Sequence, residues 1–77
     1  MKLKRVHFTV MMPSGNMQEH AYMLGEGPCG KVVSKLSVIS TRHTITITQY
    51  HTDGSHKIFT YPWKLVESKV TEEYLND

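Results

Sequence analysis

The chain has 77 residues, a formal net charge of +2 and a single cysteine, which together predict one small domain, 1–77, without a disulfide or a deeply enclosed active site. Residues 1–42 hold six Lys and Arg against two Glu, whereas residues 67–77 hold one Lys against four acids; this asymmetry is compatible with an anionic partner but does not require one. No run approaches the roughly 18 apolar residues of a membrane span, so we expect a cytoplasmic protein without a membrane anchor.

Residues 2–12 form the first predicted strand. Val6, Phe8 and Val10 alternate with polar residues, which is the pattern of a strand with one buried face. The sequence Pro-Ser-Gly-Asn at 13–16 predicts the turn that ends this strand.

Residues 17–24 fit either a strand or a short helix. A strand after a four-residue loop would place Phe8 opposite Ala21, whereas a helix would begin at Asn16 as its N-cap and end at Gly25. We favour the strand, because the preceding turn suits a hairpin and a helix of two turns is marginal.

The sequence GEGPCGK at 25–31 has the spacing of a phosphate-binding loop but predicts an ordinary surface loop. Such a cradle needs Ser or Thr after the Lys, where this chain has Val32. Glu26 would repel a phosphate, and Pro28 lacks a backbone N–H donor. Cys29 would act as a nucleophile only beside a base, which the sequence does not place. We expect no nucleotide, no cofactor and no enzymatic activity.

A third strand is predicted over 31–40, in which Leu36 and Val38 face inward. A hairpin follows it, with strands over 44–50 and 58–63. A two-residue loop would set every apolar residue of the hairpin opposite a Thr. A three-residue loop, Thr52-Asp53-Gly54, instead sets Ile47 opposite Phe59 and Ile45 opposite Tyr61. A left-handed residue is needed at the third loop position, where Gly54 stands. We therefore predict the three-residue loop, with a bulge at Gly54.

The segment after the hairpin is expected to leave the sheet. Pro62 cannot donate a ladder hydrogen bond, so it should mark an edge or an exit. A single turn and a short last strand are predicted over 64–67. A short helical turn is predicted over 71–77, with Thr71 as its N-cap.

These elements predict a mainly β fold, an antiparallel sheet or partly open barrel of four or five strands. The alternative is an α+β fold, if residues 17–24 and the C-terminus are helical. The predicted core consists of Val6, Phe8, Val10, Leu36, Val38, Ile45, Ile47, Phe59, Tyr61, Leu65 and Val66.

Two stretches together resemble Sm-like small β-barrels: the opening strand that runs into a Gly-containing turn, 6–15, and the ending KIFTYPWKLV, 57–66. The resemblance implies a small barrel, and in that family rings of such barrels bind RNA. This chain departs from the family in lacking an N-terminal helix and in having Pro62 where a basic RNA-contacting residue is expected. A shared fold does not by itself imply a shared function.

Five histidines raise the question of a metal site. Zinc sites usually show paired ligands at close spacing. His51 and His56 flank the predicted loop, but the chosen register points them to opposite faces of the hairpin. We therefore expect no metal.

The second face of the hairpin is the first candidate site, because it is rich in hydroxyl and apolar side chains that suit a protein contact. We expect a non-enzymatic binding module, such as a small phage or mobile-element regulator or inhibitor, which could also form a homodimer through a sheet edge or face. The candidate protein-binding residues are Thr44, Thr46, Thr48, Tyr50, Ile58, Thr60 and Trp63.

The alternative is an RNA- or DNA-binding barrel that uses a basic face and two aromatic side chains. It requires the first and third strands to lie next to each other. The candidate residues for this function are Lys2, Lys4, Arg5, Lys31, Lys35, Arg42, Tyr61 and Trp63.

Overall fold

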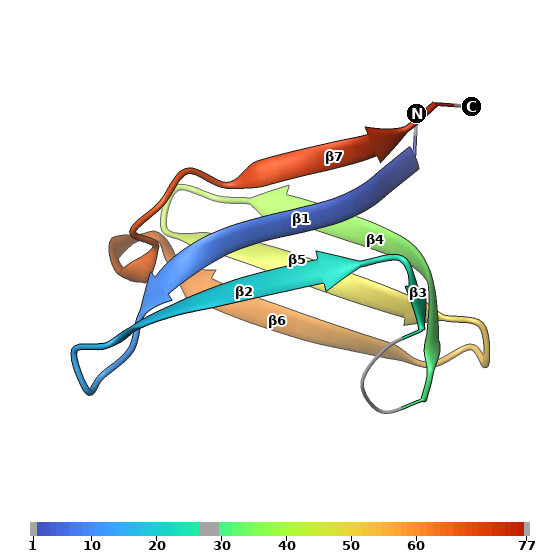
Figure 1. The fold of residues 1–77 in the computed structure, drawn as a ribbon, viewed down its shortest axis with the longest axis horizontal. Coiled ribbons are helices and arrows are strands. Elements are labelled where there is room, and N and C mark those ends of the chain that lie inside the picture. The colour runs from blue at the N-terminus through green and yellow to red at the C-terminus, as the bar shows by residue number, and fades with distance from the viewer. Residues whose placement is uncertain (1, 27–29, 77) are drawn as a thin grey trace.

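Two antiparallel sheets pack face to face in the computed structural model, which describes residues 2–26 and 30–76 (Figure 1). One sheet has the strand order β2-β1-β7 and the other the order β3-β4-β5-β6. Within the described residues the only helical element is one 3-10 turn, so the fold is mainly β, as predicted. The elements are β1 (Lys2–Met11), β2 (Met17–Met23), β3 (Gly25–Glu26), β4 (Val32–Ser40), β5 (Thr44–His51), β6 (His56–Pro62), η1 (Trp63–Leu65) and β7 (Thr71–Leu75).

The β1–β2 hairpin confirms the strand prediction for residues 17–24 and corrects its register. Phe8 lies opposite His20 and not opposite Ala21. The loop, Pro13-Ser14-Gly15, is shorter by one residue than predicted, because the backbone N–H of Met12 donates to the Asn16 carbonyl at 2.8 Å and Gly15 turns the chain at φ +88°. A shift of one residue reverses which side chains face inward.

The C-terminal segment is a strand, so the predicted helical turn over 71–77 is wrong (Asp77 itself lies outside the described residues). β7 pairs with β1, with Val6 opposite Glu72 and Leu3 opposite Tyr74. The Arg5 guanidinium meets the Glu73 carboxylate at 3.0 Å. Pairing along β1 therefore overrides the weak helix preference of TEEYL, and it brings the acidic tail against the basic front.

The β5–β6 hairpin has the predicted register. Ile47 lies opposite Phe59 and Ile45 opposite Tyr61. The His51 N–H donates to the Ser55 carbonyl at 2.9 Å, and Gly54 has φ +90°. The three-residue loop therefore lets the two apolar faces coincide.

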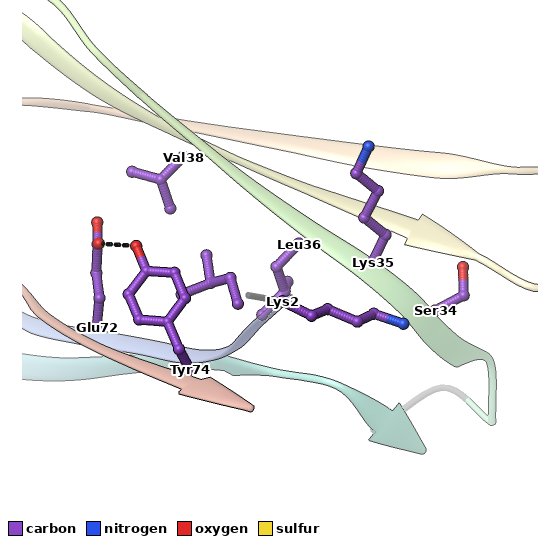
Figure 2. A pocket seen from close by; sticks show the side chains of 8 residues that line it. Lys2, Ser34, Lys35, Leu36, Val38, Glu72 and Tyr74 are labelled. Atoms are coloured by element: carbon purple, nitrogen blue, oxygen red, sulfur yellow. Dashed lines mark hydrogen bonds between the residues drawn. The ribbon is translucent and has the colours of Figure 1, made fainter. Parts of the chain in front are cut away.

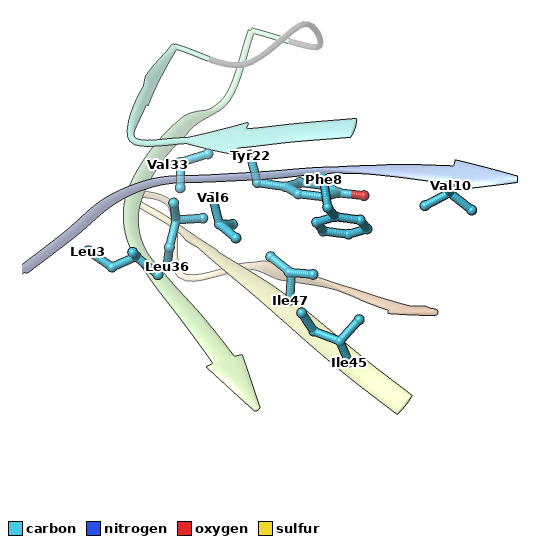
Figure 3. Close-up of a cluster of buried hydrophobic side chains, with 9 residues drawn as sticks. All are labelled: Leu3, Val6, Phe8, Val10, Tyr22, Val33, Leu36, Ile45 and Ile47. Carbon is cyan, nitrogen blue, oxygen red and sulfur yellow. The ribbon is translucent and has the colours of Figure 1, made fainter. Parts of the chain in front are cut away.

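The core lies between the two sheets (Figure 3). All eleven predicted core residues belong to it, with Val38, Phe59, Tyr61, Leu65 and Val66 partly buried at its margin. Three buried hydrophobic residues were not predicted: Leu3, Tyr22 and Val33. The polar residues Thr48 and His51 are also buried. Tyr22 comes inside through the register shift in the first hairpin. Val33 and Leu36 are both buried because the pairing of β4 with β5 is irregular between Val33 and Lys35.

The strands described do not close into a barrel, which corrects that part of the Sm-like resemblance. β6 is an edge strand that ends at Pro62, where the chain leaves the sheet as predicted. After η1 the chain crosses to the other sheet, where an isolated bridge joins Val66 to Val10 in place of the short last strand. Of the described residues, no helix is both long and apolar enough to cross a membrane.

Candidate protein-binding face

The outer face of the β4–β5–β6 sheet points away from the core and gathers most of the predicted protein-binding residues. In successive rows across the three strands, its members are Lys35, Tyr50 and His56; Ser37, Thr48 and Ile58; Ile39, Thr46 and Thr60; and Thr44 beside Pro62. No other strand of the described residues pairs over this face, because both sheets of the fold meet on the opposite side. Six of the seven predicted residues therefore lie on this side of the sheet, although Thr48 is only 8% exposed.

Three large side chains stand exposed on the outer face. Ile58 is 60% exposed, Ile39 57% and Tyr50 41%. Ile39 was not among the predicted site residues. The signal for it was present, because a strand that turns Leu36 and Val38 inward must turn Ile39 outward.

Polar side chains on the outer face are already arranged by contacts within the sheet. The Thr46 and Thr60 hydroxyls lie 3.2 Å apart. The Lys35 ammonium sits 5.6 Å from the centre of the Tyr50 ring, a cation–π geometry. The His56 ring lies 6.1 Å from the same ring. These contacts within the sheet restrict the side chains of the face.

Trp63 does not share the outer face. Its indole N–H donates to the Thr41 carbonyl at 2.9 Å, and its ring packs against the core. A shallow hollow of about 520 Å³ lies beside it, lined by Arg42, His43, Thr44, Pro62, Trp63 and Lys64. Trp63 and Thr44 therefore both border this hollow at the end of the face.

The residues of the nucleic-acid alternative are dispersed. β1 and β4 lie in different sheets, so the predicted basic face does not form from adjacent strands. Arg5 is paired with Glu73, and Lys31 lies 3.6 Å from an Asp53 carboxylate oxygen. Lys35 belongs to the outer face. Lys2 lies on β1 and borders the same groove as Lys35, Lys4 lies on β1, and Arg42 lies on the link between β4 and β5.

Tyr61 packs against the core within a cluster of aromatic rings that lies between β2 and β6. We name it the aromatic cluster: Phe8, His20, Tyr22, Phe59 and Tyr61. The Phe8 and Tyr61 rings meet edge-on with centres 5.2 Å apart, and the Tyr22 and Phe59 centres are 4.9 Å apart. The Tyr22 and Tyr61 hydroxyls share a short hydrogen bond. Burial, followed by that bond, raises the pKa of Tyr22 well above its ordinary value.

Asp53 has a role in the β5–β6 loop. The Ser55 hydroxyl and backbone N–H both donate to it, and with the Lys31 ammonium they lower the pKa of Asp53 to about 2. A carboxylate held in this way stabilises the turn, so its perturbed pKa has a structural explanation.

An inter-sheet groove of about 710 Å³ opens between β7 and β4, on the side opposite the aromatic cluster (Figure 2). Leu3, Leu36 and Val38 form its apolar floor, Lys2 and Ser34 lie at one end, and Glu72 lies at the other. The Tyr74 hydroxyl donates to Glu72 at 2.6 Å, which raises the pKa of Tyr74. Lys35 borders the groove from the rim.

Metal ligands do not gather in the described part of the chain. No group of three His, Cys, Asp or Glu side chains there is placed to hold a metal ion. His51 is buried and bonded to Ser55, whereas His56 lies on the outer face. Cys29 lies outside the described residues.

Comparison with known proteins places the chain among phage proteins. Residues 2–74 match the family described as Enterobacteria phage T3 gene 1.05 protein. The chain belongs to this family. It is 40% identical over 62 residues to a protein of Enterobacteria phage T3 described as the uncharacterized gene 1.05 protein, a match that covers 79% of this chain and 69% of that protein. No solved structure matches.

Proposed function

We propose that this phage gene 1.05-family protein is a non-enzymatic module that binds a protein partner through the outer face. The observation that carries the proposal is the exposure of Ile39 and Ile58, at 57% and 60%, on one surface that the fold leaves uncovered. Branched apolar side chains exposed on the two strands that flank β5, with the Thr hydroxyls of β5 between them, suit a protein contact.

The chemistry of the face supports a protein partner over a nucleic acid. Its only Lys or Arg side chain is Lys35, which lies against the Tyr50 ring. Binding to a phosphate backbone depends on several cations at once. The other candidate cations are separated or paired with Glu73 and Asp53.

The test is capture of host and phage proteins from an infected bacterial lysate, with and without nuclease, on the immobilised full chain. We expect a protein whose recovery is insensitive to nuclease and whose binding is lost with Ile58→Lys. Met17→Lys is the matched control, because Met17 is 55% exposed on the outer side of the other sheet. Recovery of nucleic acid alone, or equal loss of binding in both variants, would overturn the proposal.

A further inference from the structure

One edge of β4 is unpaired over most of its length, and this observation is independent of the proposed function. β3 covers this edge only at Val32 and Val33. From Ser34 to Ser40, no strand in residues 2–26 or 30–76 pairs on that side. An uncovered edge of this length is a template for another strand.

The hydrogen-bonding groups along this edge can be assigned. The His51 N–H donates to Ser55, so odd-numbered residues of β5 face β6. Successive residues of a strand face opposite neighbours, so Tyr50, Thr48 and Thr46 face β4. Their partners in register are Lys35, Ser37 and Ile39. The backbone groups of Leu36, Val38 and Ser40 therefore point to the free edge.

The inter-sheet groove that runs along this edge has a positive charge at one end and a negative charge at the other. Lys2 lies at the Ser34 end and Glu72 at the Val38 end (Figure 2). A strand from a second copy, running antiparallel, reverses this order. It brings the Lys2 of each copy to the Glu72 end of the other. Opposite charges therefore face each other when two copies are related by a twofold axis, which favours a symmetric dimer.

We propose that the protein forms a homodimer in which β4 pairs antiparallel with β4 of a second copy. The joined sheet then has the order β6-β5-β4-β4-β5-β6, and the two outer faces become one continuous surface.

Parity and charge select the register of this pairing. Apolar inner faces continue across the axis only if Leu36 lies opposite an inward residue of the other copy. Placing Ser37 on the twofold axis sets Leu36 opposite Val38 and Lys35 opposite Ile39. This register also separates the two Lys35 ammoniums. An axis at Leu36 would bring them closer together. The two Ser37 residues then form a non-hydrogen-bonded pair, whose Cα atoms lie about 4.5 Å apart in such sheets.

Cysteine crosslinking tests the register directly, because that spacing lies within the range of a disulfide. In a Cys29→Ser background of the full chain, Ser37→Cys should oxidise rapidly to a covalent dimer. The matched control is Thr60→Cys, on the exposed outer side of the opposite edge strand β6. It should crosslink slowly.

Charge variants and sedimentation test the interface without a covalent bond. The native chain should sediment as a concentration-dependent dimer, and Ser37→Lys, which sets two ammoniums on the axis, should weaken dimerisation about tenfold. Lys2→Glu and Glu72→Lys should each weaken dimerisation, and the double variant should restore it.

Lys2 and Glu72 lie outside the outer face, so their variants test the dimer separately from the proposed function. A monomer at every concentration, or Ser37→Cys crosslinking no faster than Thr60→Cys, would overturn the inference. A dimer that Ser37→Lys leaves unchanged would do so as well.

Discussion

The space between the two sheets is filled differently on its two sides, one between β2 and β6 and the other between β7 and β4. Between β2 and β6 the aromatic cluster spans the gap, and the hydroxyls of Tyr22 and Tyr61 join the two sheets. Between β7 and β4 there is instead a groove of about 710 Å³, and Tyr74 at its margin is 48% exposed. The closed side, between β2 and β6, therefore stabilises the packing of the two sheets. The open side, between β7 and β4, leaves the edge of β4 unpaired.

The outer face extends this contrast from the sides to the surface of the second sheet. Ile45 and Ile47 of β5 are at most 1% exposed toward the core, whereas Ile39 and Ile58 face solvent on the other side of the same sheet. Isoleucine side chains thus stabilise the core on one face of the sheet and remain exposed to solvent on the other.

The largest effect is expected from removing the ring at the centre of the closed side. Phe8 is 1% exposed and packs edge-on against Tyr61. Phe8→Ala should lower the free energy of unfolding by about 3–5 kcal/mol, which would leave a domain of this size largely unfolded. Urea denaturation followed by circular dichroism measures the loss. The comparison variant Tyr74→Ala, on the open side, should cost less than about 1 kcal/mol. Equal losses would remove the contrast between the sides.

A smaller effect is expected at alkaline pH, again on the closed side. Burial and the bond to Tyr61 raise the pKa of Tyr22 above its ordinary value of 10.0. The folded state therefore keeps a proton that the unfolded state releases, so the contribution of Tyr22 to stability is constant below pH 10 and falls as the pH rises further. Unfolding measured from neutral to strongly alkaline pH should show this fall. Tyr22→Phe should flatten it, and an unchanged slope in that variant would assign the fall to other groups.

Hydroxyl deletion should give a still smaller difference between the sides. Tyr61→Phe removes the partner of a buried hydroxyl, with an expected loss of about 1–2 kcal/mol. Tyr74→Phe removes a bond to Glu72 at an exposed site, with an expected loss of less than about 0.5 kcal/mol. The pair of unfolding curves checks the order. A larger loss for Tyr74→Phe would mean that the open side contributes more to the fold than its exposure indicates.

Sequence reasoning succeeded where side-chain parity constrained the backbone. In the β5–β6 hairpin, one register alone united Ile47 with Phe59, and Gly54 supplied the matching turn. The outer face followed from the same parity. In the first hairpin, by contrast, a four-residue loop was predicted although Gly15 stands at the third loop position, as Gly54 does in the second hairpin. The three-residue loop places His20, and not Ala21, opposite Phe8.

The C-terminal strand was missed because its formation depends on a distant partner. TEEYL has little strand preference of its own, and Thr followed by two Glu is typical of a helix start. β7 forms along β1, where Glu73 meets Arg5. The opposite charges of the two termini were visible in the sequence, but pairing them required knowing that the ends meet. The inter-sheet groove depends on this strand, so it could not be predicted either.

The most direct test of the central claim, that the outer face is dispensable for folding and available to a partner, is the free energy of unfolding of an Ile39→Ser, Ile58→Ser double variant. Both side chains are more than half exposed. The account predicts a change within about 1 kcal/mol of the native chain, together with loss of the captured protein. A loss of stability close to that of Phe8→Ala would show that these residues belong to the fold and would contradict the account.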